Sequence, residues 1–290
     1  MIYLKLLLTA FFWGGTFVAG RVLKQNVEPF SAAFLRFAVA AFLLLAIVRK
    51  REGRFPRLER SQWLPVILLG LTGVFAYNAF FFKGLQLISA GRASLVIALN
   101  PVLVALFSAW FYSEKLSPVK IAGILTSVTG AMVVISRGNL AGALKGGVGF
   151  GELIIFGCVV SWVAYSLIGK TVMQTLSPLV ATAYAALTGM LLLAIPAWVE
   201  GLPGDLWRYT LPEWISIFYL GLFGTVIGFV WYYEGIQKIG PMRAALFINF
   251  VPVSAIALAY FILAEPITIS LLIGACLVIT GVYLTNRPTR

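Results

Sequence analysis

Apolar residues fill ten long runs of this sequence, and most charged residues collect in the short stretches between them. Each run approaches the roughly 20 residues that an α-helix needs to cross the hydrocarbon core of a bilayer. Proline stands just before three of the runs, at Pro29, Pro118 and Pro178, where a helix start tolerates it. The pattern predicts ten membrane-spanning helices at residues 3–22, 30–48, 63–82, 93–112, 119–136, 151–170, 179–198, 213–233, 244–263 and 269–286.

The fold class follows from the solvent that these runs require. Within hydrocarbon, each backbone N–H and C=O must be paired inside the protein, which a helix achieves by itself. The chain is 61% hydrophobic and 11% charged, whereas soluble domains carry about 25% charged residues. We therefore expect an all-α integral membrane protein whose macromolecular partner is the lipid bilayer. The net charge of +12 is distributed between apolar runs, so it does not indicate nucleic-acid binding.

A repeat divides the chain into two related parts. The segment KGLQLISAGRASLV at 83–96 returns 151 residues later as EGIQKIGPMRAALF at 234–247, with six of fourteen residues identical. Ordinary residue usage would give roughly one identity. Nearer the N-terminus a shift of 149 residues pairs Trp13 with Trp162. We predict a single membrane domain, residues 1–290, built from two five-helix repeats at 3–136 and 151–286.

The charges of the loops predict how the helices are oriented. With a cytoplasmic N-terminus, the cytoplasmic segments hold fourteen Lys and Arg residues and the outer segments seven, which favours cytoplasmic placement of both termini. Residues 49–60 carry six basic residues, although such a loop is also suited to anionic lipid. Because each repeat has five spans, the second repeat is expected to be inverted relative to the first. We expect a multi-pass protein of the plasma membrane, the inner membrane in a bacterium.

Inverted repeats predict a mechanism. They are typical of carriers that work by alternating access, with the substrate site near the bilayer midplane between the two repeats. The expected architecture is ten helices surrounding a central cavity. The sequence does not decide between a monomer and a homodimer.

Three segments also carry a family resemblance. They read PFSAAFLRF at 29–37, YSEKLSPVKIAGILTSVTG at 112–130 and LAEPITISLLIGACLVITG at 263–281. Together they resemble the drug/metabolite transporter superfamily, in its EamA branch, over nearly the whole chain. The resemblance implies a ten-helix exporter of amino acids, other small metabolites or drugs. It also implies a cavity lined by the first, third, fourth, sixth, eighth and ninth helices, with the fifth and tenth at the periphery.

Polar and aromatic residues within the apolar runs are the candidates for contact with a small-molecule substrate. Aromatic residues in such runs also serve as lipid-facing belts, and an amide in mid-membrane also joins helices. A charge in a span is expensive, so Arg36 is expected either to pair with a glutamate or a helix C-terminus, or to meet a substrate carboxylate. The predicted substrate-binding residues are Trp13, Thr16, Arg36, Tyr77, Asn78, Asn100, Trp162, Tyr165, Tyr232 and Asn249.

Two classes of function fit these observations. The first is a secondary transporter that exports small metabolites such as amino acids, aromatic or apolar ones among them. The second is a membrane-embedded enzyme acting on a lipid or isoprenoid substrate. The sequence has no histidine and its acids are scattered, which weighs against the enzyme and indicates no metal or other cofactor. Because no acid lies at mid-span, obligatory proton coupling is not expected.

Overall fold

The computed structural model describes residues 1–23, 26–88, 96–136, 138–144, 149–263 and 268–286, which form helices and no strand. Helical stretches long and apolar enough to cross a membrane occur eight times in these residues. They are Ile2–Gly20, Pro29–Glu52, Arg60–Gly84, Pro118–Ile135, Phe150–Val172, Pro178–Val199, Leu211–Ile239 and Ile269–Asn286. The prediction of an all-α, multi-pass membrane protein is confirmed.

Six of the expected spans are single helices, and the connections between spans are short. The six are α1 (Ile2–Leu23), α2 (Pro29–Glu52), α7 (Pro118–Ile135), α9 (Phe150–Val172), α10 (Pro178–Val199) and α16 (Ile269–Asn286). Short helical turns lie in two of the connections, as α8 (Leu140–Leu144), α11 (Leu202–Asp205) and η2 (Leu206–Arg208).

The third and eighth expected spans each contain a π-helical stretch at matching positions. The third consists of α3 (Arg60–Leu69), η1 (Gly70–Ala76) and α4 (Tyr77–Leu87). The eighth consists of α12 (Leu211–Tyr219), η3 (Leu220–Ile227) and α13 (Gly228–Ile239). A π-helical stretch is rare, changes the pairing of backbone carbonyls and often marks a functional site. Its presence in both spans supports the predicted repeat.

The fourth and ninth expected spans are interrupted near their prolines. The fourth appears as α6 (Asn100–Tyr112), which begins one residue before Pro101, and residues 93–95 of the expected span lie outside the described residues. The ninth is α14 (Pro241–Ala245), the 3₁₀ turn η4 (Leu246–Asn249) and α15 (Phe250–Leu263). Proline removes a backbone hydrogen bond, so a change of helical geometry is expected there. Because both spans are shorter as continuous helices, the count of ten spans stays a prediction.

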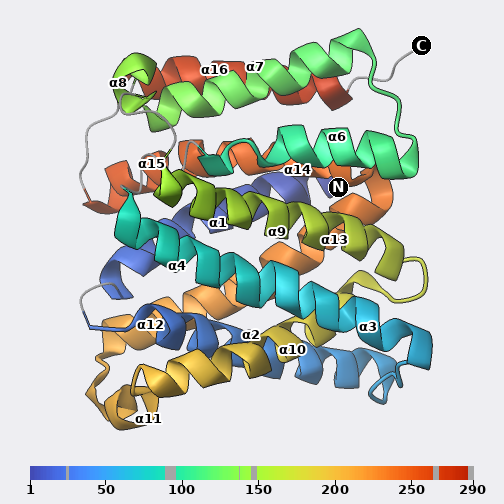
Figure 1. Cartoon of the computed structure of the whole chain (residues 1–290), viewed down its shortest axis with the longest axis vertical. Helices are drawn as coiled ribbons and strands as arrows, with labels where there is room; N and C mark the ends of the chain where they lie inside the picture. Colours follow the sequence, from blue (N-terminus) through green and yellow to red (C-terminus); the bar gives the residue numbers. More distant parts are fainter. Residues whose placement is uncertain (24–25, 89–95, 137, 145–148, 264–267, 287–290) are drawn as a thin grey trace.

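The helices lie side by side in layers (Figure 1). Helices α2 and α10 pack together at one end of the molecule, and α7 and α16 pack together at the other. Between α7 and α16 the backbones approach closely, since a β-carbon added to Gly130 would lie 2.7 Å from the Gly274 carbonyl oxygen. Glycines on helix faces permit such close packing in membranes. The remaining helices form the middle layers, where the two halves of the chain meet.

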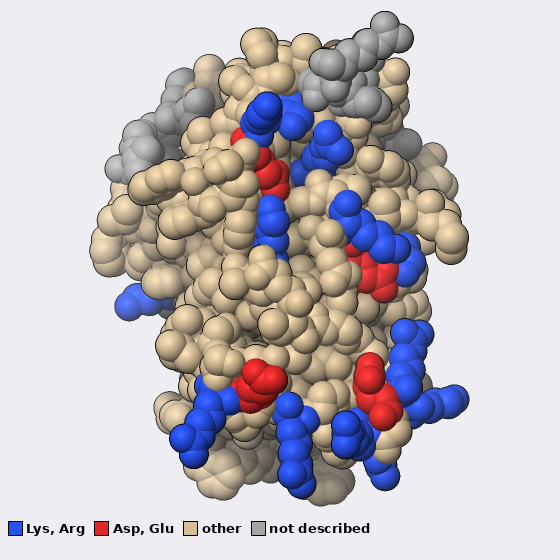
Figure 2. Space-filling view, turned by 90° about the vertical axis from the view of Figure 1, so that its right-hand side faces the viewer, with Lys and Arg blue, Asp and Glu red and all other residues tan. Residues whose placement is uncertain are grey.

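One side of the molecule carries many basic residues. The N-terminus, the end of α16 and the connection from α2 to α3 lie on the right-hand side of Figure 1, and Figure 2 shows that side crowded with Lys and Arg. Helix α2 ends there in Arg49, Lys50 and Arg51. Two ion pairs on these helix ends join the halves of the chain: Lys5 with Glu234 at 2.5 Å, and Lys170 with Glu114 at 2.9 Å.

Candidate functional site

Glycine contacts show that the two halves pack around the centre in the same way. A β-carbon on Gly84 would clash with Ile155, and one on Gly235 would clash with Leu6. The two glycines are 151 residues apart and their partners 149 apart, as the sequence repeat requires. At the level of helices, α4 packs on α9 and α13 packs on α1. Equivalent contacts of this kind are what the predicted repeat requires.

Five predicted site residues form one aromatic cluster at the meeting of α1, α4, α9 and α13. Trp162 lies at its centre, with ring centroids 5.4 Å from Trp13, 5.7 Å from Tyr77, 5.3 Å from Tyr165 and 5.4 Å from Tyr232. Trp162, Tyr165 and Tyr232 are buried, whereas Trp13 and Tyr77 are half-buried. These residues come from separate parts of the sequence, so folding alone brings them together.

The contact between the two tryptophans places the cluster between the halves. Trp13 of α1 and Trp162 of α9 are repeat counterparts, and their rings meet edge to face with an interplanar angle of 84°. In the predicted inverted repeat, counterpart residues touch only near the two-fold axis. A substrate site on that axis, near the middle of the membrane, is where inverted-repeat carriers bind their substrates.

One edge of the cluster is polar and is formed by the π-helical stretch η3. The Trp13 indole N–H donates to the Gly224 carbonyl oxygen at 2.8 Å, and the Thr16 hydroxyl donates to the Trp13 carbonyl oxygen at 2.6 Å. The Thr16 methyl group packs on Gly224, where an added β-carbon would lie 2.9 Å from it. Because residue 224 is a glycine, α1 can pack close to η3, and the Trp13 indole N–H can reach the Gly224 carbonyl oxygen.

Arg36 lies at the same edge and bonds neutral partners. Its Nε donates to the Thr225 hydroxyl at 2.8 Å, and its Nη2 donates to the Gly224 carbonyl oxygen at 3.4 Å. The guanidinium lies 6.0 Å from the ring centroid of Phe229, which in turn lies 5.6 Å from Trp162. No acidic residue in the described part of the chain pairs with Arg36. Of the expected partners, a glutamate is therefore not found among the described residues.

The opposite edge of the cluster is formed by the other π-helical stretch, η1, and it is largely aromatic. The Tyr165 ring lies against Gly73, where an added β-carbon would be 2.2 Å from it. Tyr165 also stacks on Tyr233 with centroids 4.7 Å apart. The Asn78 amide N–H donates to the Val74 carbonyl oxygen of its own helix at 2.5 Å. In this structure the Asn78 side chain therefore bonds to the backbone of its own span, beside the cluster.

The two remaining candidates lie outside the aromatic cluster. The Asn249 amide donates to the Ser127 hydroxyl of α7 at 2.9 Å, which joins η4 to a peripheral helix. Asn100 is buried at the start of α6, and its Oδ1 has no hydrogen-bond partner among the described residues. A buried amide oxygen without a partner is costly, so Asn100 is the better candidate for a polar ligand contact.

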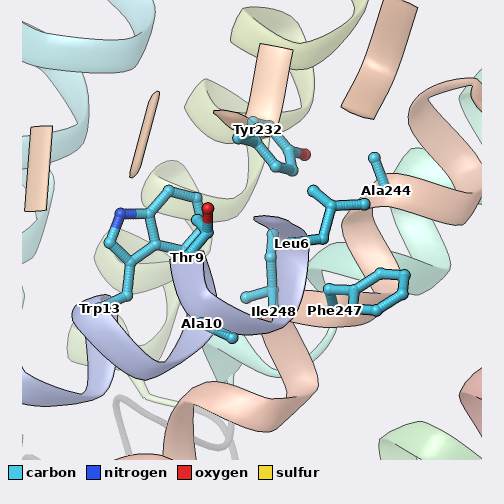
Figure 3. A pocket seen from close by; sticks show the side chains of 8 residues that line it. All are labelled: Leu6, Thr9, Ala10, Trp13, Tyr232, Ala244, Phe247 and Ile248. Atoms are coloured by element: carbon cyan, nitrogen blue, oxygen red, sulfur yellow. The ribbon is translucent and has the colours of Figure 1, made fainter. Parts of the chain in front are cut away.

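A small pocket adjoins the cluster beside Trp13 and Tyr232 (Figure 3). It leaves no room for a metabolite, and its lining residues are Leu6, Thr9, Ala10, Trp13, Tyr232, Ala244, Phe247 and Ile248. Ligand pockets are usually about 300–1,000 Å³, so the aromatic side chains must separate to admit a metabolite. The structure accordingly represents a closed centre.

The sequence analysis missed two residues of this region. Thr9 lines the pocket, is 2% exposed, and has a hydroxyl without a partner among the described residues. Its spacing of four residues from Trp13 and seven from Thr16 puts it on the same helix face, a signal that was available. Phe229 was missed although its repeat counterpart, Asn78, was itself a predicted site residue, so the repeat offered a signal here as well.

Comparison with known proteins gives a consistent set of relatives. A model of the EamA-like transporter family matches residues 1–136 and 149–287. The chain is 31% identical to the uncharacterized transporter YyaM of Bacillus subtilis, covering 100% of this chain and 94% of that protein. It is 31% identical to an uncharacterized transporter of Archaeoglobus fulgidus, covering 98% of each. It is 30% identical to a probable terminal-alkyne amino-acid exporter of Streptantibioticus cattleyicolor, covering 98% and 93%.

A solved structure shares the fold. A protein crystal structure superposes with a TM-score of 0.78 over 98% of this chain and 97% of its own, at 24% sequence identity. At that identity the likeness concerns the arrangement of helices alone.

Proposed function

Because this chain belongs to the EamA-like transporter family, we propose that it is a secondary transporter that exports small amphiphilic metabolites such as amino acids. The observation that carries this proposal is the contact of Trp13 with Trp162, which joins counterpart residues of the two halves at the centre of the molecule. The relative named as an amino-acid exporter supports this class of substrate. Aromatic rings at the centre suit an apolar or aromatic side chain.

The proposed mechanism is alternating access between two inverted repeats, residues 3–136 and 151–286. The closed aromatic centre would separate toward one side of the membrane and then toward the other. On the basic side, the pairs Lys5–Glu234 and Lys170–Glu114 each connect one repeat to the other. Both pairs must break when the cavity opens to that side.

The basic side is proposed to be cytoplasmic, in the plasma membrane, because basic residues are retained there. Thiol labelling tests this. Cys158 is buried and Cys276 is exposed, so variants with one accessible cysteine are built on a Cys276→Ser background. We expect Trp207→Cys to react with an impermeant reagent outside intact cells, and Phe55→Cys to react only after lysis. The reverse labelling pattern would overturn the orientation.

Counterflow in proteoliposomes tests the transport proposal itself. Vesicles loaded with unlabelled phenylalanine, tryptophan or leucine should accumulate the labelled amino acid with saturation, and vesicles loaded with glucose or phosphate should not. Recovery of chemically unchanged label separates a carrier from an enzyme. The absence of counterflow for every amino acid would contradict the proposal for this substrate class.

Energy coupling is proposed to be uniport or exchange, without obligatory proton coupling, since Glu114, Glu152 and Glu234 lie at or near helix ends. An imposed pH gradient should leave the steady-state amino-acid distribution unchanged. Uphill accumulation driven by the gradient would contradict this part of the proposal.

A further inference from the structure

Arg36 presents an intramembrane positive charge whose described partners are all neutral. A guanidinium has five N–H donors in a fixed plane, and the described bonds of Arg36 use two of its three nitrogens. A charge within a membrane span is expensive and is usually paired or functional. The described partners, a hydroxyl and a carbonyl oxygen, carry no negative charge. The site therefore holds an excess positive charge that an anionic ligand would neutralise.

The two bonds of Arg36 differ in strength, which leaves part of its donor edge available. The Nε bond to Thr225 is 2.8 Å long, and Thr225 is itself fixed by donating to the Leu220 carbonyl oxygen at 3.0 Å. The Nη2 bond to Gly224 is 3.4 Å long, beyond the usual range for N–H···O bonds. Thr225 therefore holds the plane of the guanidinium, while the outer nitrogens remain able to bind another group.

The counterpart positions of the first π-helical stretch lack this chemistry. The second stretch contains Thr225 and packs against Arg36. The repeat places Val74 at the position equivalent to Thr225 and Ala185 at the position equivalent to Arg36. Where Thr16 packs on Gly224, the ring of Tyr165 packs on the counterpart glycine. One centre thus has a cationic, hydroxyl-bearing edge and an opposite edge made of aromatic rings.

We propose that the guanidinium of Arg36 binds the carboxylate of the transported metabolite, while the rings of Trp162 and Tyr165 receive its apolar part. This rests on the proposed function and narrows its substrates to small organic monocarboxylates with an apolar or aromatic tail, amino acids among them. Arginine matches a carboxylate through two parallel N–H···O bonds. The Phe229 ring is close to both the Arg36 guanidinium and the Trp162 ring, so one small ligand could reach from the arginine to the aromatic rings.

Two probes of equal size and different charge test this site in the purified full-length protein. They are 3-phenylpropionate and its neutral amide, 3-phenylpropionamide, titrated by calorimetry. Wild type should bind the carboxylate about 10- to 100-fold more tightly than the amide, as expected for hydrogen bonds to a charged group. Arg36→Gln should remove that preference and leave affinity for the amide unchanged. Arg51→Gln, which removes an exposed arginine at the end of α2, should behave like wild type.

Other outcomes overturn the assignment. Equal loss of affinity for both probes in Arg36→Gln would show that the residue only maintains the fold. Equal affinity of wild type for the two probes would also contradict it, whether or not Arg36→Gln folds. Arg36→Lys supplies a second variant, because it keeps the charge but not the planar fork and should retain part of the preference.

Counterflow separates this inference from the proposed function. Carboxylate preference that depends on Arg36, without counterflow of any amino acid, would uphold the anion site and contradict the transporter. Saturable amino-acid counterflow by a protein that does not distinguish the two probes would uphold the transporter and overturn the anion site.

Discussion

The two π-helical stretches have matching positions in the chain and different surroundings. At η1, the glycine Gly73 receives the ring of Tyr165. At η3, the glycine Gly224 receives Thr16, and its carbonyl oxygen accepts from Trp13 and Arg36. Both stretches have the same helical form and a glycine that allows close approach. The side chains around the two glycines differ, so one edge of the cluster is polar and the other is aromatic.

The largest effect is expected at the centre of the aromatic cluster. Trp162→Ala removes the ring that contacts Trp13, Tyr77, Tyr165 and Tyr232, and transport should fall to background while the protein still reaches the membrane. Trp162→Phe keeps a ring and loses no described hydrogen bond, so it should retain most activity. Counterflow, with membrane levels measured by immunoblot, makes the comparison. Normal transport by the alanine variant would show that the cavity lies on other helix faces.

A second comparison separates two buried amides. Asn100→Ala should abolish most transport with little change in melting temperature, since the Oδ1 of Asn100 has no partner among the described residues. Asn249→Ala should mainly lower the melting temperature, because it breaks the bond to Ser127, worth about 0.5–1.5 kcal/mol. Thermal unfolding and counterflow are measured on both variants. Unimpaired transport by Asn100→Ala would remove that residue from the site.

A third comparison exchanges the polarity of the two edges by one atom. Thr225→Val removes the acceptor that orients the Arg36 Nε and should weaken binding of 3-phenylpropionate by roughly 3- to 10-fold. Val74→Thr adds a hydroxyl at the counterpart position and should leave that affinity unchanged. Calorimetry on the pair tests whether orientation of the guanidinium is specific to η3. Equal effects of the two changes would contradict the proposed polarity.

The last comparison concerns the packing of the two glycines. Gly73→Ala should lower the melting temperature by several degrees, because its β-carbon would meet the rigid Tyr165 ring at 2.2 Å. Gly224→Ala should lower it less, since its nearest neighbour is the Thr16 methyl group at 2.9 Å. The melting temperatures of both variants in the same detergent test this order. A larger loss for Gly224→Ala would mean that the polar edge is the more tightly packed of the two.

Most of the helical architecture could be predicted from the pattern of apolar residues along the sequence. The long apolar runs predicted the membrane helices, because a span of hydrocarbon sets their length. The repeat pairs Trp13 with Trp162, and the rings of these two residues are in contact. The π-helical form of residues 70–76 and 220–227 was not predicted, because an apolar sequence that forms a π-helix looks like one that forms an α-helix.

The candidate site was foreseen in part, for reasons that lie in individual residues. Arg36 was recognised as costly from its position, but the neutral partners Gly224 and Thr225 lie about 190 residues away and only folding brings them near. Asn249 was chosen for its neighbouring proline, yet its amide turns toward Ser127 on a peripheral helix. Sequence position gives the depth of such a residue more readily than the direction of its side chain.

The central claim is that one ligand lies across the two edges in a single orientation. A crystal structure of the full-length protein with 3-(4-iodophenyl)propionate tests this most directly, since anomalous scattering locates the iodine atom. We predict the iodine beside Trp162 and Tyr165, with the carboxylate within hydrogen-bonding distance of the Arg36 guanidinium. An iodine atom beside Arg36, or a ligand that contacts neither edge of the aromatic cluster, would contradict the account.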